Sequence, residues 1–311
     1  MKRIFCIALC ALLALSVTAC GDKKPTEPAA TSAVATEAPA TKDEAAANST
    51  MKDFIARFDD TPTGGDQPVY EDENLTVTAH GINYAPIAGP EVRLTIENRY
   101  KQDITVQSPD AVVNGYMISP QLEISVPAGK AVSGNLSLSY FSLALADITR
   151  IREIEFSLRV TESKDYNHTL LTTDVLSIRT SAANATPDTA APDDSGQIAY
   201  DKNKVKIVLK GVGSDRPDSD DPELTVYLYN GTEKAVKICT DSVIVNGYDM
   251  TSAMNLTVLP GKRAVDCVPF YGQDMEEYGI EDIDSVQVSF SIRDAESWKK
   301  LASTDLIDVA V

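Results

Sequence analysis

The stretches VVNGYMIS (112–119) and IVNGYDMT (244–251) lie 132 positions apart and share the residues Val-Asn-Gly-Tyr. Asn and Gly both tolerate the positive φ angles that a type I′ turn requires, so Asn-Gly between short apolar runs is a strong hairpin signal. We therefore predict hairpin turns at Asn114-Gly115 and at Asn246-Gly247. A ligand site shared by the two turns is the alternative, which we favour less because a hairpin needs this dipeptide in any case.

The repeat extends on both sides of the two turns, with an offset that drifts only from 130 to 134. The aligned residues are Tyr70 with Tyr200, Gly81 with Gly211, Asn98 with Asn230, Gly129-Lys130 with Gly261-Lys262, and Phe156-Ser157 with Phe290-Ser291. A segment rich in Pro, Ala and Asp lies near position 190. We predict one domain at 66–181, a linker at 182–195 and a second domain at 196–311, each of a usual domain size.

Within each copy, apolar and polar residues alternate with a period of two, as in LTVTAHG (75–81) and ELTVYLYN (223–230). About seven short strands at this spacing, separated by Gly, Pro, Asn or Asp, are typical of an antiparallel β-sandwich. The predicted fold class is all-β, with two tandem sandwiches. One or two helical turns are expected before the seventh strand, at 143–151 and 274–283.

The pattern resembles the immunoglobulin-like domains of lipoproteins and secreted antigens of Gram-positive bacteria, many of them of unknown function. The resemblance rests on the Asn that ends the second strand, on the Asn-Gly-Tyr turn, and on PAGK (127–130) and LPGK (259–262) before a strand. It covers roughly 70–180 and 197–311. It implies an extracytoplasmic, immunoglobulin-like sandwich and supplies no catalytic residue.

The first 19 residues have the pattern of a bacterial export signal. Lys2 and Arg3 precede an apolar run from Ile4 to Val17, which is too short for a stable membrane span. Val-Thr-Ala then precedes Cys20, as in a lipoprotein signal. We predict a signal peptide at 1–19 and a lipid on Cys20 that anchors the protein to the cell membrane on its extracytoplasmic face. An ordinary signal peptide with a chance cysteine is the alternative.

Residues 20–65 are predicted to be a flexible tether that ends in a short helix. The tether is rich in Ala, Thr and Pro and cannot bury enough apolar surface to fold. Further on, Met51, Phe54, Ile55 and Phe58 share one face of a helix. We favour docking of this face on the first domain, since so short a helix is marginal alone. A contact with a partner or with the membrane surface is the alternative.

The charge and the residue types exclude several functions. The net charge is −18, which disfavours nucleic acid as a partner. Only two histidines, His80 and His168, are present, and no cysteine or second histidine lies near either of them in the sequence. A zinc site needs three or four clustered ligands, and no nucleophile or phosphate-binding motif occurs in a suitable context. We predict no enzymatic activity and no cofactor.

An acidic loop lies between the first two strands of the second domain. Such a loop could bind Ca²⁺ weakly, although it lacks the turn glycine of an EF-hand, and a solvated loop is the interpretation we favour. Its carboxylates are Asp215, Asp218, Asp220, Asp221 and Glu223.

The remaining candidates are cysteines and aromatic residues. Cys239 and Cys267 align with polar residues of the first copy, and a disulfide between them is predicted for an exported chain, with two free thiols as the alternative. Tyr227 and Tyr229 alternate with apolar residues and are expected on a sandwich surface, with a platform for a glycan or a protein as the alternative. Trp298 is expected to cover the edge of the core.

Three functions remain open at this stage. The first is a lipid-anchored surface protein that binds another protein or an envelope polymer, or that acts as a spacer. The second is a solute-capturing lipoprotein of a transport system, which is disfavoured because long amphipathic helices are few. The third is a surface hydrolase, which is disfavoured because no catalytic constellation is present.

Overall fold

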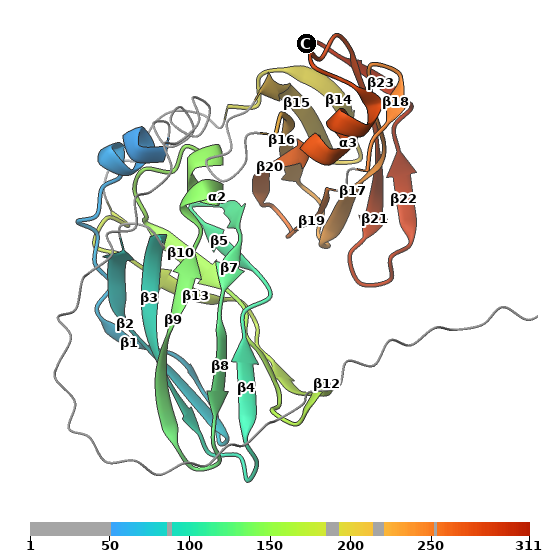
Figure 1. Cartoon of the computed structure of the whole chain (residues 1–311). Coiled ribbons are helices and arrows are strands. Elements are labelled where there is room, and N and C mark those ends of the chain that lie inside the picture. The colour runs from blue at the N-terminus through green and yellow to red at the C-terminus, as the bar shows by residue number, and fades with distance from the viewer. Residues whose placement is uncertain (1–50, 86–88, 185–192, 214–220, 252–253) are drawn as a thin grey trace, which may run out of the picture. The chain divides into compact units, whose positions relative to one another are not determined.

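The first sandwich is built around a five-stranded antiparallel sheet, seen in a computed structural model of the chain (Figure 1). The structure describes residues 51–85, 89–184, 193–213, 221–251 and 254–311. These residues belong to one compact unit of the chain, Ala40–Val311. In order across the sheet, the strands are β1 (Asp66–Glu71), β2 (Leu75–Ala85), β3 (Gly89–Asn98), β9 (Ala131–Leu138) and β7 (Pro120–Gln121).

The second layer of this sandwich consists of two shorter sets of strands, because its long strands are interrupted. One set is β13 (Leu176–Arg179), β10 (Glu153–Phe156), β5 (Ala111–Val113) and β6 (Tyr116–Ile118). The other set is β12 (Asp165–Thr172), β11 (Arg159–Glu162), β4 (Ile104–Gln107) and β8 (Glu123–Val126). At the interruption, the Ser157 hydroxyl donates to the Asp110 carboxylate and Ser108 donates to the Ser157 carbonyl.

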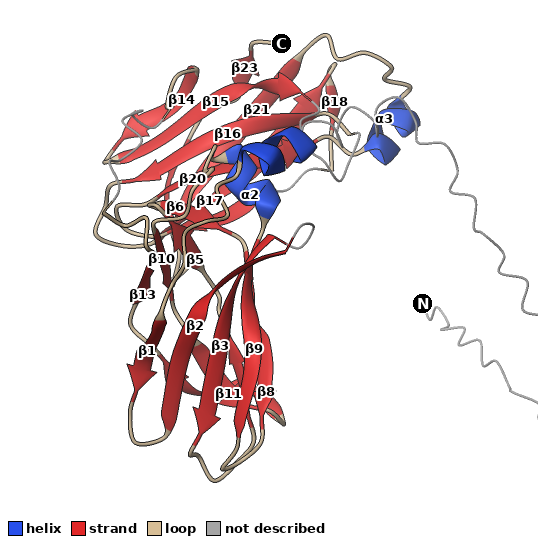
Figure 2. Ribbon diagram, turned by 90° about the vertical axis from the view of Figure 1, so that its left-hand side faces the viewer, coloured by secondary structure: helices blue, strands red, loops and turns tan. Residues whose placement is uncertain are grey.

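The second sandwich repeats the same strand order, and the long strands of its second sheet are not interrupted (Figure 2). Its first sheet contains β14 (Gln197–Lys202), β15 (Val205–Gly213), β16 (Glu223–Asn230) and β20 (Arg263–Pro269). Its second sheet contains β18 (Tyr248–Asp249), β17 (Val236–Val245), β21 (Val286–Asp294) and β22 (Lys300–Ser303), with β19 (Asn255–Val258) and β23 (Ile307–Val309) paired to β17 and β21. One residue pair, Tyr116 with Arg263, joins β6 to β20.

The topology is that of an immunoglobulin-like sandwich. Strand β16 lies between β15 and β20, and β17 lies beside β21. In the same way, strand B of an immunoglobulin domain lies between A and E, while C lies beside F. The all-β prediction with two tandem antiparallel sandwiches is therefore confirmed.

Alternation along the strands places one face of each sheet in a core. In β2 the buried residues Leu75, Val77 and Ala79 alternate with partly exposed ones, as a period of two requires. The residues buried in the two sandwiches form two separate apolar clusters, one for each repeat.

The Asn-Gly pairs form the same turn in both copies. Asn114 and Gly115 have φ angles of 51° and 89°, and Asn246 and Gly247 have 50° and 86°. Val113 pairs with Tyr116, and Val245 pairs with Tyr248. These are two-residue hairpins with positive φ at both central positions, as a type I′ turn requires.

The asparagine side chains of these turns have a second role. The Asn114 amide donates to the Arg150 carbonyl, and its oxygen accepts from the Arg152 backbone N–H at 2.9 Å. Asn246 makes the same contacts 132 positions later, with the Asp282 carbonyl and the Asp284 N–H. Each turn asparagine therefore also holds the loop that leads into β10 in the first sandwich or β21 in the second.

A second repeated asparagine is fully buried at the end of β3 and of β16. The Asn98 amide donates to two backbone carbonyls, and its oxygen accepts from the backbone N–H two residues later. Asn230 makes the matching three bonds. Since each side chain satisfies three groups inside the protein, these two residues fix the turn that follows each strand.

Candidate functional site

A short helix follows β9 in the first sandwich and β20 in the second. In the first sandwich this helix is α2 (Tyr140–Leu145), whose cap Ser139 accepts a bond from the Ser142 N–H at 3.4 Å. In the second it is α3 (Gly272–Tyr278), which ends at Gly279 in the left-handed conformation. Leu143 of α2 and Met275 of α3 are buried toward the cores. We call this region the helix end of each sandwich.

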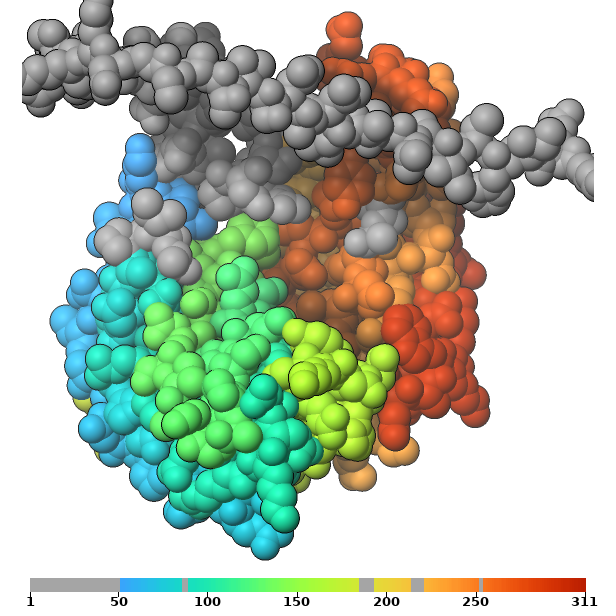
Figure 3. Space-filling model, turned by 60° about the horizontal axis from the view of Figure 1, so that its bottom comes forward, coloured from blue at the N-terminus to red at the C-terminus, as the bar shows by residue number. Residues whose placement is uncertain are grey.

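The helix end of the first sandwich is covered by the segment at 51–58. Residues 51–57 are helical, and Phe54 and Phe58 are buried in the first core. Their ring centroids lie 6.2 Å and 5.3 Å from that of Tyr140, both edge-on. Burial raises the pKa of the Tyr140 hydroxyl above its ordinary value. The docking that the sequence favours is confirmed, and Figure 3 shows the blue start of the described chain against the first sandwich.

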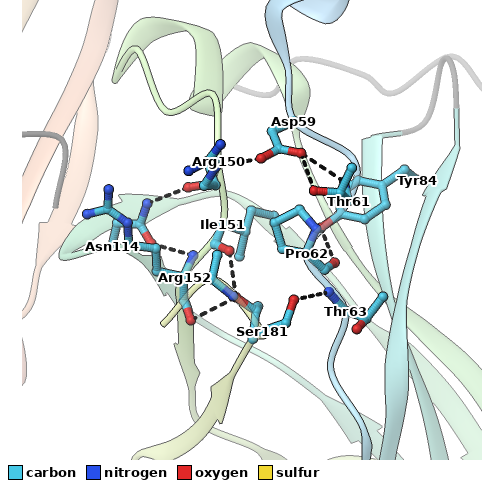
Figure 4. A network of polar contacts seen from close by, with 12 residues as sticks. Asp59, Thr61, Pro62, Thr63, Tyr84, Asn114, Arg150, Ile151, Arg152 and Ser181 are labelled. Carbon is cyan, nitrogen blue, oxygen red and sulfur yellow. Dashed lines mark hydrogen bonds and ion pairs between the residues drawn. The ribbon is translucent and has the colours of Figure 1, made fainter. Parts of the chain in front are cut away.

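Polar contacts hold the chain that follows this helix (Figure 4). The Asp59 N–H donates to the Thr149 carbonyl at 2.7 Å, and the Asp59 carboxylate pairs with Arg150. Hydrogen bonds from the Thr61 hydroxyl and N–H, with a smaller contribution from Arg150, hold the pKa of Asp59 below its ordinary value.

Residues 59–65, which we call the strap, make two further contacts with the first sandwich. The Tyr84 hydroxyl donates to the Pro62 carbonyl at 2.7 Å. Thr63 and Ser181 exchange two bonds, at 3.0 Å and 2.8 Å, so the strap also contacts the residues that follow β13. Residues 51–65 are thus a structural part of the first sandwich.

The helix end of the second sandwich is open and aromatic. Tyr271 precedes α3 as Ser139 precedes α2, and it is 43% exposed. Tyr248, the first residue after the second Asn-Gly turn, is 46% exposed, and Tyr278 is 38% exposed. The rings of Tyr248 and Tyr278 stack at 4.8 Å with an interplanar angle of 13°.

These three residues, Tyr248, Tyr271 and Tyr278, form a surface that we call the tyrosine face. Tyr271 and Tyr278 are seven residues apart along α3, so they lie on the same side of the helix. The Asp274 carboxylate accepts from the Thr251 N–H at 2.6 Å and ties α3 to the chain beyond β18. The face is therefore built on two elements that are fixed to one another.

The surroundings of the tyrosine face are acidic. No Lys or Arg occurs between Arg263 and Arg293, or between Lys237 and Lys262. Exposed carboxylates of these two stretches are those of Asp241, which pairs with Lys300, and of Asp249, Glu276, Glu277, Glu281, Asp282 and Asp284. Exposed tyrosine rings offer apolar area and a hydroxyl at low cost in conformational entropy, and the acidic surroundings attract cationic groups.

The predicted acidic loop falls partly outside the described residues. Asp215, Asp218 and Asp220 lie in the segment 214–220, of which the structure describes nothing. Glu223 lies on β16, is fully buried, and accepts a bond from the Cys267 thiol at 2.9 Å, so it is not a ligand on a solvated loop. In the described ranges, no group of three or more His, Cys, Asp or Glu residues, Asp221 included, is arranged to hold a metal ion.

The predicted disulfide is absent from the structure, in which Cys239 and Cys267 are free thiols. Cys239 follows the core residue Ile238 on β17, and Cys267 precedes the core residue Val268 on β20. Neighbouring strand residues point to opposite faces, so both thiols point outward from two different sheets. They are directed away from one another across the sandwich, which explains why the expected bond cannot form.

The aromatic residues named from the sequence also lie at places that differ from the predictions. Tyr227 is 3% exposed and offers no platform, while Tyr229 is partly buried below the Arg263 guanidinium at 5.4 Å. Trp298 does not cover the core edge as expected. It is half-exposed, with the Lys237 ammonium 4.2 Å from its ring centre. The tyrosine face was missed, although the lack of basic residues nearby in the sequence was visible.

The two histidines each contact a carboxylate on the first sandwich. His80 Nδ1 lies 3.1 Å from Asp66, and its Nε2 lies 2.9 Å from the Thr95 hydroxyl. His168 Nδ1 lies 3.0 Å from Glu162. Cys20 lies outside the described residues. In the part of the chain that the structure does describe, no helix has the length and apolar character needed to cross a membrane.

Comparisons with known proteins found only distant likenesses. No family matches the sequence, and no curated protein matches it. Among solved structures, the chain is similar to the YadV chaperone, at 12% identity over 70% of this chain and 92% of that chain, with a TM-score of 0.23. It is also similar to a protein of unknown function from Porphyromonas gingivalis W83, at 13% identity over 78% and 93% of the two chains, with a TM-score of 0.19. Likenesses at this level carry no argument about function.

Proposed function

We propose that this is a lipid-anchored protein on the extracytoplasmic face of the cell membrane, and that it binds another protein through the tyrosine face. The observation that supports binding is the difference between the two helix ends. The first copy buries Tyr140 under Phe54 and Phe58, whereas the second exposes Tyr248, Tyr271 and Tyr278 together. Clustered exposed tyrosines on a rigid support are typical of surfaces that bind proteins.

The anchor rests on the sequence. An apolar export signal followed by Val-Thr-Ala-Cys favours lipid attachment at Cys20, and the tether would let the sandwiches stand away from the membrane. Replacement of Cys20 by Ala should release the protein from membranes. Mass spectrometry of a mature protein that begins at another, unmodified residue would contradict the anchor.

Binding is tested by capture from envelope extracts. The wild-type chain is compared with the double variant Tyr248→Ala/Tyr278→Ala. The control is Tyr166→Ala, because Tyr166 is also half-exposed but lies on β12 of the first sandwich. A protein retained by the wild type and the control but lost from the double variant supports the proposal. Retention by all three chains, or capture of a polysaccharide or a small solute instead, contradicts it.

A further inference from the structure

The net negative charge of the second sandwich is concentrated in two stretches of its sequence. Residues 196–311 contain twenty Asp or Glu and twelve Lys or Arg. Nine of the twenty acidic residues lie at 238–261 and 264–292, and none of the twelve basic residues lies there. The rest of this sandwich has eleven acidic and twelve basic residues and is close to neutral. The tyrosine face belongs to the two acidic stretches, since Tyr248 lies in the first and Tyr271 and Tyr278 lie in the second.

Along α3, a carboxylate lies between the two tyrosines of that helix. Asp274 comes three positions after Tyr271 and four before Tyr278, and its N–H donates to the Tyr271 carbonyl at 3.0 Å. Residues three and four positions apart are neighbours on a helix, so Asp274 lies on the side of α3 that carries both rings. Its carboxylate is held there by a bond from the Thr251 N–H at 2.6 Å. This side of α3 therefore combines a negative charge with aromatic area.

Further carboxylates are fixed to the turn that carries Tyr248. The side chain of Asn246, two residues before Tyr248, donates to the Asp282 carbonyl and accepts from the Asp284 N–H, both at 2.8 Å. The side chains of Asp282 and Asp284 are exposed. The loop with these two charges is thus held against the hairpin from which Tyr248 projects.

Two other aromatic rings of the second sandwich lie against a cation of the chain itself. The Lys237 ammonium is 4.2 Å from the ring centre of Trp298, and the Arg263 guanidinium is 5.4 Å from that of Tyr229. Such contacts are favourable because the face of an aromatic ring carries partial negative charge. Among the residues that the structure describes, no Lys or Arg lies in this way over a ring of the tyrosine face. The face combines exposed rings and carboxylates without a cation from the described chain.

We infer that the tyrosine face binds a basic segment of its partner protein, one that presents arginine or lysine side chains. This inference rests on the proposed protein-binding function and names the chemistry of the partner. One cationic group of the segment stacks on the exposed rings of Tyr248 and Tyr278, and its neighbours lie near Asp274, Asp282 and Asp284. The concentrated negative charge also attracts such a partner before contact, so binding is weaker at high salt.

The probe is a labelled, end-capped heptapeptide of alternating Gly and Arg, titrated into the full mature chain with fluorescence anisotropy as the readout. We expect saturable binding that weakens at least about tenfold with Tyr248→Ala/Tyr278→Ala. Binding should be unchanged with Tyr166→Ala, which removes a half-exposed tyrosine of the first sandwich. The matched peptide with citrulline in place of each Arg has nearly the same shape without the charge, and it should not bind.

The carboxylates are tested by a second pair of variants. Asp282→Asn/Asp284→Asn keeps the backbone bonds to Asn246 and removes two charges, and it should weaken binding of the Arg peptide at least about fivefold at low salt. The control Glu73→Gln/Asp174→Asn removes two charges from exposed positions of the first sandwich. It should change the Kd by less than about twofold, because its charges are screened at a distance.

Several results would overturn the inference. These are no binding of the Arg peptide, equal binding of the citrulline peptide, equal binding to Tyr248→Ala/Tyr278→Ala, or equal losses in the two charge variants. Self-association of the wild-type chain that is lost with Tyr278→Ala in analytical ultracentrifugation would assign the face to a second copy instead. The capture experiment separates the two levels, because a tyrosine-dependent partner without binding of the Arg peptide leaves the proposed function standing and removes only the basic ligand.

Discussion

The two helix ends of this molecule have the same strand order and the same Asn-Gly turn, yet the aromatic residues of one are buried and those of the other are exposed. Tyr140 is 7% exposed under Phe54 and Phe58, while Tyr271 is 43% exposed. The segments that precede the two sandwiches also differ. One is an amphipathic helix, and the other is a linker without aromatic residues. A repeat can therefore keep its framework while a short flanking segment adds to the core of one copy.

The outer faces of the two first sheets show a second difference of this kind. In the first sandwich this face carries His80 and Thr95, which bond to one another. In the second, the residues aligned with them are Lys210 and Tyr227, and Tyr227 is buried. Lys210 pairs with Asp193 at the end of the linker. Equivalent strands thus present a polar face in one copy and a largely covered face in the other.

The largest expected effect comes from removal of the helix that closes the first sandwich. Phe58→Ala should lower the free energy of unfolding of that sandwich by about 3–5 kcal/mol, since it leaves a cavity beside Tyr140 and Phe54. Urea unfolding followed by far-UV circular dichroism measures the change. The contrasting variant Tyr271→Ala should cost under about 1 kcal/mol, because Tyr271 is 43% exposed. Equal losses in the free energy of unfolding would contradict a difference between the two helix ends.

A smaller loss, similar in the two sandwiches, should follow from removal of the repeated buried asparagine. Asn98→Ala and Asn230→Ala each leave two backbone carbonyls and one N–H without their side-chain partner, at a cost of about 2–3 kcal/mol. Asn167→Ala, at an exposed position of β12, is the control and should change little. Loss confined to one sandwich in each variant would support independent folding of 66–181 and 196–311. Simultaneous loss of both would mean a single cooperative unit.

Acid should open the closed helix end through Asp59. Hydrogen bonds from Thr61, then Arg150, lower its pKa, so its contribution to stability is fully present above the unfolded value of about 3.9. That contribution is lost as the pH falls through the lower, folded pKa. Amide hydrogen exchange of 51–58 should accelerate below about pH 4 in the wild type. In Asp59→Asn the exchange of 51–58 should already be faster at pH 7. Identical pH profiles of exchange in the wild type and the variant would show that this carboxylate does not hold the strap.

The smallest effect is expected from reduction of the protein, because the two thiols are not joined. Unfolded, unreduced protein should contain two reactive thiols at Cys239 and Cys267, and a reductant should leave the melting temperature of the second sandwich unchanged. In the native state Cys239 should be alkylated first. Burial raises the pKa of both thiols, but Cys267 is more deeply buried and also donates to Glu223. A count of zero reactive thiols would instead show that the two cysteines form a disulfide.

Much of the fold could be predicted because its signals are local. The period of two in β2 and β16 predicts strands, and Asn-Gly predicts the hairpins, since both depend on the preferences of adjacent residues. The docking of Phe54 and Phe58 also followed from a pattern within two helical turns. The placement of Cys239, Cys267 and Glu223 did not follow, because alternation does not show which sheet a strand joins or what covers its outer face.

By itself, the sequence determined that the chain repeats an all-β domain, where its turns lie, and that one amphipathic helix precedes the first copy. These features depend on backbone angles and on the apolar pattern of short segments. Only the tertiary structure decided that Tyr140 is covered while Tyr248, Tyr271 and Tyr278 are exposed, and that the two thiols face away from one another. Exposure depends on contacts between residues far apart in the chain, and a local pattern contains no record of them.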